Sequence, residues 1–140
     1  MNRKRRTKIF IEFARDEVMT FAKEIQDRYP IELIQEAKEG LVMVKVRETA
    51  QNSLFYLGEV LVTEAKVRIE NHLGLGLVKG SERDFSFALA IADAAFSASL
   101  PEAKEWMDIF LQAEKRGLEM LQEKRSRVAK SKVDFQSMNQ

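Results

Sequence analysis

The spacing of apolar residues predicts a helical segment at the start of the chain. Over residues 7–29, apolar side chains recur at steps of three and four, which is the repeat of one buried helical face. These positions are Phe10, Phe13, Ala14, Val18, Phe21 and Ile25. The helix could break after Ala14, because Asp16 is suited to cap a second helical piece. Pro30 should end the segment, because the residue before a proline is disfavoured in helical angles.

An alternating pattern replaces the helical repeat after Pro30. Residues 31–34 fit either a short helix or a strand that leads into a turn at residues 38–40, and we favour the strand. From Leu41 onward the alternation of apolar and polar residues is clearer and predicts a half-buried strand. The face expected to be buried carries Val42, Val44 and Val46.

Two further strand-like segments follow. Apolar and polar residues alternate over residues 60–69, after a shorter apolar piece at residues 54–56. Residues 73–78 can return antiparallel to them, because the connection is short enough for a hairpin. Residues 31–79 are therefore predicted to form an antiparallel β-meander of three to four strands.

The helical repeat returns at Ser81. Ser81 and Asp84, three residues later, fit a capping box at the start of a helix over about residues 82–98. The alanine-rich sequence of this helix should permit close packing. Pro101 fits the first turn of a last helix over about residues 101–128, which ends in a group of basic residues.

The end of the chain, residues 129–140, carries its own pattern of apolar and polar residues. A chain terminus frays unless something holds it down. Val133, Phe135 and Met138 are spaced two and three apart. We therefore expect this tail to anchor against a surface of this protein or of a partner.

Composition agrees with one domain over residues 1–140, because a chain of 140 residues can bury one sizeable core. The predicted fold class is α+β, with N-terminal and C-terminal helices covering the antiparallel meander.

The sequence has no cysteine, so it supplies no disulfide, thiol nucleophile or cluster ligand, and this fits a reducing compartment. No apolar run approaches the roughly 20 residues of a membrane span. We expect a cytoplasmic protein.

Net charge near zero argues against a surface devoted to nucleic acid or membrane. The chain has 23 Lys and Arg against 22 Asp and Glu. Two local basic groups remain, one at residues 3–6 and one at residues 124–132. The ordinary interpretation of each is a solvated terminus or a solvated helix end, although a binding patch stays open.

Three polar residues are the main candidates for chemistry. His72, the single histidine, lies in a predicted turn, so a Ser-His-Asp or Cys-His catalytic group is nearly excluded. Glu59 follows Gly58 within an apolar strand, which indicates a bulge with an exposed carboxylate or a close backbone approach. Asp93 lies in an alanine-rich run and is either buried and paired or exposed to water. No catalytic residue and no metal ligand are predicted.

The glycine-rich segment at residues 73–80 lacks the spacing of a phosphate-binding loop. Gly80 still precedes a predicted helix start, and Lys79 is beside it, so this point could contact an anion. The structural alternative is a hairpin in which Gly74 and Gly76 allow close packing.

Four motifs, taken together in their order and spacing, carry a resemblance. They are Gly58-Glu59 followed by Thr63 and Val67, then Gly74-x-Gly76-x-Val78-x-Gly80, then Ala92-Asp93-Ala94, and finally Ala129-x-Ser131-x-Val133-Asp134-Phe135-x-x-Met138. In these residues the chain resembles the PhnG subunit family of the bacterial carbon-phosphorus lyase system. The resemblance covers roughly residues 41–138 and is most specific over residues 131–138.

The resemblance implies an accessory subunit of a multiprotein core. That core makes alpha-D-ribose 1-methylphosphonate 5-triphosphate from ATP and methylphosphonate, with release of adenine. It implies PhnI, PhnH and PhnJ as partners, a homo-oligomer contact within the complex, and no cofactor on this chain, with ATP as a substrate of the complex. The residues expected to bind partners are Ser131, Val133, Asp134, Phe135 and Met138. A stand-alone enzyme, and a small nucleic-acid-binding or other interaction adaptor, are the alternatives.

Overall fold

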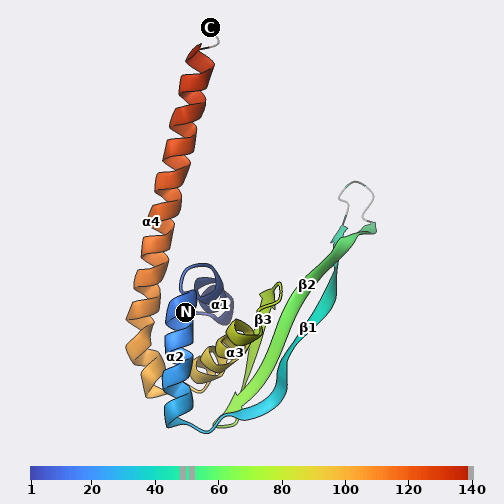
Figure 1. The fold of residues 1–140 in the computed structure, drawn as a ribbon, viewed down its shortest axis with the longest axis vertical. Helices are drawn as coiled ribbons and strands as arrows, with labels where there is room; N and C mark the ends of the chain where they lie inside the picture. Colours follow the sequence, from blue (N-terminus) through green and yellow to red (C-terminus); the bar gives the residue numbers. More distant parts are fainter. Residues whose placement is uncertain (48–49, 51–52, 139–140) are drawn as a thin grey trace.

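The computed structural model describes residues 1–47, 50 and 53–138, and for residues 132–138 the backbone alone. Within these residues the chain forms four helices and one antiparallel sheet with the strand order β1-β2-β3, which confirms the α+β class. The elements are α1 (Arg3–Glu12), α2 (Arg15–Arg28), β1 (Glu32–Arg47), β2 (Leu54–Ile69), β3 (His72–Lys79), α3 (Arg83–Ser97) and α4 (Pro101–Met138). Helix α3 lies across one face of the sheet, and α2 and α4 lie beyond it (Figure 1).

The predicted helix break is present. Helix α1 ends at Glu12 and α2 begins at Arg15, with Ala14 in a non-helical conformation between them. Asp16 lies in the first turn of α2 but does not cap it. Tyr29 is extended before Pro30, as expected from the restriction that a proline places on the preceding residue.

The sheet differs from the predicted meander in its continuity. The expected turn at residues 38–40 is wrong, because Gly40 lies within β1 and pairs with Val62 of β2. The two expected pieces of the second strand are one strand of 16 residues. One register shift leaves Leu57 without an opposite residue, so a bulge lies beside Gly58. A long two-stranded hairpin, β1–β2, results, with β3 added along one side of its lower half (Figure 1).

The core forms where α3 packs on β2 and β3. Alternate residues of β2 are buried against the helix: Thr63, Ala65, Val67 and Ile69. Gly74 and Gly76 of β3 face the α3 backbone so closely that a Cβ added at Gly76 would lie 1.9 Å from the Ser86 carbonyl oxygen. The Ser86 hydroxyl donates to the Gly76 carbonyl over 2.7 Å. Ala92 of α3 is fully buried, as the alanine-rich pattern predicts.

An aromatic cluster joins the helices on the other side of α3. Its rings belong to Phe10, Phe21, Phe96, Trp106 and Phe110. Phe10 and Phe110 meet edge to face with centroids 4.7 Å apart. Each of the four helices contributes at least one ring, so α3 is packed between the sheet and the other three helices.

The start of α3 is not the predicted capping box. Glu82 is the residue before the helix, and no side chain caps it. The Ser81 hydroxyl instead donates to Glu39 of β1, and the Glu82 N–H donates to the Thr63 hydroxyl over 3.0 Å. Contacts with two strands therefore position the start of this helix, which has no side-chain cap.

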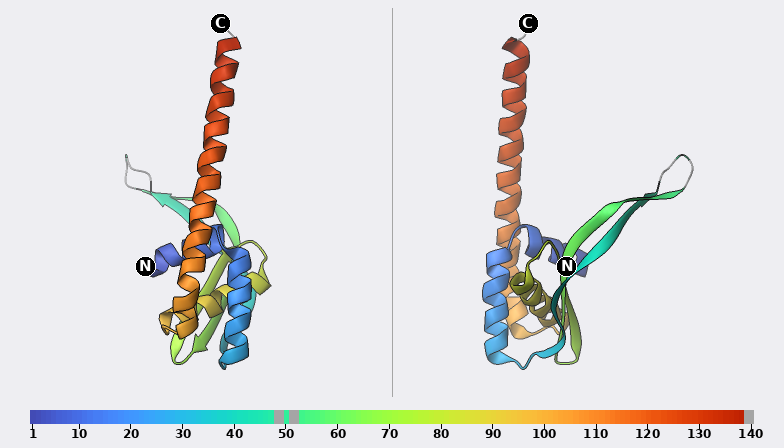
Figure 2. Two further views of the ribbon diagram at one scale, coloured as in Figure 1. Left: turned by 90° about the vertical axis from the view of Figure 1, so that its left-hand side faces the viewer. Right: turned by 45° about the vertical axis from the view of Figure 1, so that its right-hand side comes forward.

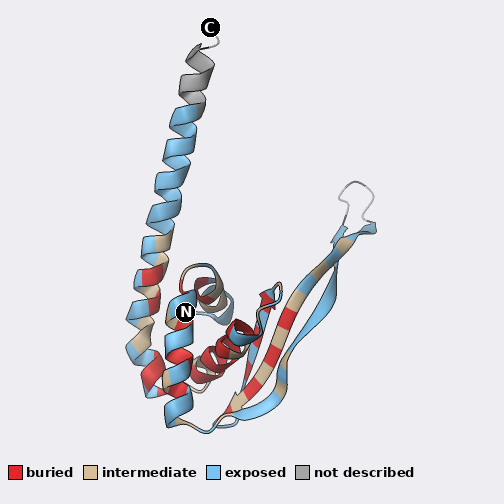
Figure 3. Cartoon of the chain, in the orientation of Figure 1, coloured by how far each residue is buried: buried red, intermediate tan, exposed pale blue. Residues whose placement is uncertain are grey.

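Two long segments extend beyond the packed region (Figures 1 and 2). The first is the outer half of the β1–β2 hairpin, where the predicted half-buried face is wrong at Val42, which is 46% exposed, and at Val46, which is 40% exposed, whereas Val44 is half-buried. The second is α4, which continues to Met138 and not to residue 128 as predicted. At 1.5 Å per residue this helix is about 57 Å long, and every residue from 118 to 131 is exposed (Figure 3).

A first prediction concerns the close approach at Gly76. Gly76→Ala should lower the free energy of unfolding by about 1–3 kcal/mol or more, because the new Cβ meets fixed backbone of α3. Gly40→Ala is the matched control, since a Cβ there meets nothing within 4 Å. Chemical denaturation of both variants measures the difference. Equal stability of the two variants would contradict the role assigned to Gly76.

Candidate functional site

Asp93 lies at the centre of a buried charge network that joins three elements. Asp93, on α3, is 2% exposed. It accepts hydrogen bonds from the Leu75 N–H of β3 over 2.9 Å, from Arg6 of α1 over 2.8 Å, and from both Arg3 donors that face it. Of the two alternatives predicted for Asp93, the structure confirms the buried and paired carboxylate and not the exposed one.

The environment of Asp93 favours the ionised carboxylate. Burial by itself raises the pKa of Asp93, but the hydrogen bonds from Arg3, from the Leu75 N–H and from Arg6 outweigh it and bring the pKa below its ordinary value. A carboxylate held ionised by two guanidinium groups is a poor general base. Its position therefore indicates a structural role, tying α1 to α3 and to the edge of β3.

The basic group at residues 3–6 is not a solvated terminus. Arg3 and Arg6 bind Asp93, and Arg5 binds Glu114 of α4 over 2.9 Å. Arg6 also lies over the Phe96 ring at 5.3 Å. Carboxylates of this chain thus engage three of the four cations, which lowers the charge that they could offer to a nucleic acid.

The anion-contact candidates Lys79 and Gly80 lie at the turn between β3 and α3. The Gly80 N–H donates to the Leu61 carbonyl over 2.8 Å, and the Gly80 carbonyl accepts from the Thr63 hydroxyl over 2.6 Å. The residues around this turn carry both signs of charge, because Arg15 pairs with Glu82 over 2.6 Å and Arg83 pairs with Glu39 over 3.6 Å. Lys79 itself is exposed. Anion contact here stays a prediction.

The other predicted motif residues are distributed over separate parts of the molecule. Gly58 and Glu59 lie at the bulge in the outer hairpin, and Glu59 is exposed. Gly74 and Gly76 lie under α3, which supports their packing alternative. The fold does not bring these glycines together with the residues proposed to bind partners.

The predicted partner-binding residues belong to the last turns of α4. Ser131 is exposed on α4, beyond the residues of this helix that lie near the α1–α2 corner. The backbone of Val133, Asp134, Phe135 and Met138 is helical, and the contacts of their side chains lie outside the described part of the structure. This segment is therefore the far end of a projecting helix, and not a separate tail after it.

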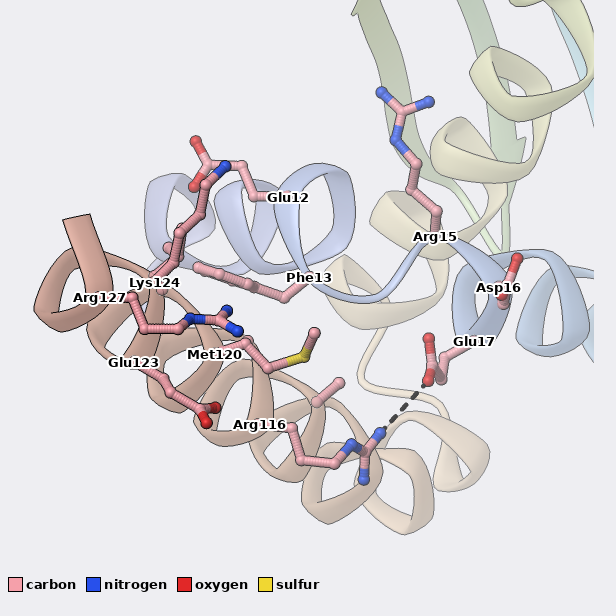
Figure 4. Close-up of a pocket in the computed structure, with 13 residues that line it drawn as sticks. Glu12, Phe13, Arg15, Asp16, Glu17, Arg116, Met120, Glu123, Lys124 and Arg127 are labelled. Atoms are coloured by element: carbon pink, nitrogen blue, oxygen red, sulfur yellow. Dashed lines mark ion pairs between the residues drawn. The ribbon is translucent and has the colours of Figure 1, made fainter. Parts of the chain in front are cut away.

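A groove that the sequence analysis missed lies between α4 and the corner joining α1 to α2 (Figure 4). Its volume is about 990 Å³. Phe13 lies against α4 at Gly117, where an added Cβ would approach the ring to 2.1 Å, and Met120 exposes 69% of its surface nearby. Arg116 bridges to Glu17 across the groove over 3.5 Å.

Charges around this groove are balanced. The four cations that line it are Arg15, Arg116, Lys124 and Arg127, and the four anions are Glu12, Asp16, Glu17 and Glu123. A triphosphate or phosphonate would need an excess of positive charge. Phe13, Met120 and Leu121 line the groove beside these charges, and such a mixture of apolar and charged side chains is common on protein-binding surfaces. Only the fold reveals this groove, because the residues of its two walls are about 100 positions apart in the sequence.

The outer hairpin forms a second surface that the sequence analysis missed. Large apolar side chains are exposed on both of its faces: Leu41, Val42, Met43, Val46, Leu54, Phe55, Tyr56 and Leu57. A monomeric soluble protein rarely exposes so many contiguous apolar residues. The sequence shows the alternation of valines in this segment, but the absence of a covering helix here depends on where α3 begins.

The described residues offer little for metal or acid–base chemistry. His72 is exposed, and its Nδ1 lies 2.8 Å from the Glu70 carbonyl oxygen. No group of three potential metal ligands occurs among the residues that the structure describes. In the same part of the chain, no helix is both long and apolar enough to cross a membrane.

A second prediction tests the Asp93 network. Asp93→Asn should lower the free energy of unfolding at neutral pH by about 3 kcal/mol, because two guanidinium groups lose their ionised partner. Asp108→Asn, at an exposed position on α4, is the matched control. Denaturant titration of both variants makes the comparison, and equal losses would contradict the role of Asp93.

The same network predicts a pH dependence. Because the pKa of Asp93 is lowered in the folded state, its contribution is fully present above the unfolded pKa of about 3.9. The contribution is lost as the pH falls through the folded pKa. The stability of the unmodified chain should therefore drop more steeply on acidification than that of Asp93→Asn.

Comparisons with known proteins agree with the resemblance seen in the motifs. The sequence matches the family model described as "Phosphonate metabolism protein PhnG" over residues 1–140. A comparison with curated proteins found no match. The family match extends over the projecting helix and the hairpin as well as the packed region, and the family acts in phosphonate metabolism. The chain therefore belongs to the PhnG family of phosphonate metabolism proteins.

Proposed function

We propose that this chain is a non-catalytic, accessory subunit of the carbon-phosphorus lyase core complex. In this role it is required for the step that joins methylphosphonate to the ribose of ATP and releases adenine. The product is alpha-D-ribose 1-methylphosphonate 5-triphosphate. The partners are PhnI, PhnH and PhnJ, and ATP is a substrate of the complex without a cofactor held by this chain. Membership of the PhnG family supports the broader part of this proposal, which is a role in phosphonate metabolism.

One observation about the structure carries the accessory role. The packed region has two extensions, the outer hairpin and α4 beyond Gly117, and both expose apolar side chains (Figures 1 and 3). Such extensions cost conformational freedom and gain little from burial within this chain. They are stabilised when a partner covers them. A protein built in this way is suited to hold other subunits together.

The exposed half of α4 fits recognition of a helix in a groove of a partner. Leu118, Leu121 and Val128 lie three and seven residues apart, which places them along one side of the helix. Residues 133, 135 and 138 extend the apolar composition toward the end. This helix, together with the residues expected at its end, is the surface that we assign to PhnI or another core subunit.

The concave surface on this chain supports a binding role over catalysis. The groove at α4 has balanced charge, and the buried Asp93 is held by two arginines. A site for nucleotide and phosphonate needs concentrated positive charge and a group that activates the reacting atoms. In the proposed complex, another subunit supplies both.

A third prediction tests the division of labour. The purified chain, incubated with ATP and methylphosphonate, should release no adenine above a protein-free blank, because catalysis requires the partners. The same chain co-expressed with PhnI, PhnH and PhnJ should support adenine release, and omission of this chain from the co-expression should abolish it. Adenine is measured by chromatography. Release by the chain alone, at the rate of the full complex, would contradict the accessory role.

A fourth prediction concerns the end of α4. Phe135→Ala should leave the thermal midpoint of the isolated chain nearly unchanged, since this segment lies far from the packed region. It should weaken binding to the core partners by about 2 kcal/mol or more, as expected for loss of an aromatic anchor. Co-purification and growth on methylphosphonate as the phosphorus source measure the effect.

Gln136→Ala is the control for that variant, because the next residue on a helix points about 100° away. It should retain partner binding. A large loss of stability in the isolated Phe135→Ala chain, with assembly intact, would show that the segment folds back on its own domain.

A further inference from the structure

The groove between α4 and the α1–α2 corner continues onto an exposed face of the projecting helix. On α4 its lining includes residues spaced by three and four, which is the repeat of one helical face: Ala113, Gly117, Met120, Lys124 and Arg127. The same spacing leads on to Val128 and Ser131, and both are exposed. From Gly117 to Ser131 this face is about 21 Å long, or about four helical turns.

The charges along this surface are separated between its two walls. Residues 12–17, at the corner, include three anions and one cation. The cation, Arg15, is 2.6 Å from Glu82 and lies over the Phe85 ring, and it points away from α4 (Figure 4). Residues 116–131 of α4 include five cations and two anions. The two walls therefore differ in sign, although the charges that line the groove balance.

Two cations beside the groove are available to a partner. Among the residues that the structure describes, neither Lys124 nor Arg127 belongs to an ion pair, whereas Arg116 is 3.5 Å from Glu17. Met120, one turn before Lys124, is 69% exposed. This face of α4 therefore combines an exposed apolar side chain with uncompensated positive charge, which is complementary to an acidic partner.

We propose that the groove binds an amphipathic helix of another subunit of the complex, with carboxylates on the flank that faces α4. The apolar side of that helix packs on Phe13, Met120 and Leu121, and its carboxylates face Lys124 and Arg127. The inference rests on the proposed function, because the helix belongs to a core subunit. It deepens that function by adding an interface separate from the one assigned to the end of α4.

Charge and shape favour this occupant over others. A nucleic acid would be repelled by the carboxylates of Glu12, Asp16 and Glu17. A second copy would bring the same excess of cations on residues 116–131, so its α4 is a poor match for this face. Side chains spaced by three and four form ridges that interdigitate with those of another helix, which favours a helix over an extended segment.

Site-specific photo-cross-linking tests the groove in the assembled complex. In the full chain p-benzoylphenylalanine replaces Met120, the variant is co-expressed with PhnI, PhnH and PhnJ, and mass spectrometry identifies the attached peptide. The control carries the same group at Gln122, which is exposed and lies about 200° around α4 from Met120. The group at position 120 should attach to an amphipathic, carboxylate-bearing helix of another subunit, and the group at position 122 should attach much less.

Equal cross-linking from the two positions, attachment to a second copy of this chain, or attachment to a segment without carboxylates overturns the proposal. Absence of a cross-link from position 120 in a complex that still co-purifies also overturns it, and leaves the proposed function intact. Failure of the unmodified chain to co-purify with any core subunit contradicts the proposed function itself, and this inference with it.

A charge reversal tests the acidic flank separately. Lys124→Glu should weaken binding to the partner subunits about tenfold at low salt, and the difference should shrink as salt screens the charges. Lys115→Glu is the matched control, because Lys115 is exposed about 180° around α4 from Lys124. A carboxylate-to-lysine change in the cross-linked segment should restore binding of Lys124→Glu. Equal affinity of the two variants, with both folded by circular dichroism, overturns the assigned acidic flank.

Discussion

The contact between α3 and β3 sets the geometry of the whole molecule. Because Gly74 and Gly76 have no side chain, the helix backbone comes within contact distance of the strand backbone. The Ser86 hydroxyl then reaches the Gly76 carbonyl, and Asp93, further along the same helix, reaches the Leu75 N–H. The carboxylate of Asp93 in turn fixes the arginines of α1. A larger residue at either glycine would separate the layers on which these bonds depend.

The four helices and the lower half of the sheet form a complete core, yet a large part of the chain lies outside it. Helix α3 has 15 residues and covers only the lower half of a 16-residue hairpin. Helix α4 has 38 residues, and every residue from 118 to 131 is exposed. Burial within one chain therefore cannot account for the apolar residues at Leu41, Phe55 or Leu121. Their exposure is the observation on which the proposed association with other chains rests.

Several residues of the motifs have structural roles that do not require a ligand. Thr63 donates to the Gly80 carbonyl and accepts from the Glu82 N–H, so it holds the turn that leads into α3. Val67 and Val78 are buried beneath the helix, and Asp93 joins it to α1. The motif residues at these positions therefore stabilise the core. The residues that face outward on the hairpin and on α4 are the ones available for recognition.

The sequence by itself determined the order and type of the elements, because local periodicity is written in neighbouring residues. It allowed a break after Ala14, and it predicted the end of α2 before Pro30 and the start of α4 at Pro101. It also raised burial of Asp93 and close packing at the glycines as alternatives. It failed at Gly40, where pairing with Val62 overrides a local turn signal, and at Ser81, whose hydroxyl bonds to Glu39 across the fold.

Only the tertiary structure decided which apolar residues are covered. Val42 and Val67 both belong to strands in which alternate residues are valine or another apolar residue, but α3 covers Val67 and begins, at Arg83, without reaching over Val42. The partners of Arg3 and Arg6, and the groove between Phe13 and Met120, likewise depend on segments far apart in the chain. The physical reason is that periodicity defines the face of an element, whereas burial depends on the length and position of whatever packs against that face.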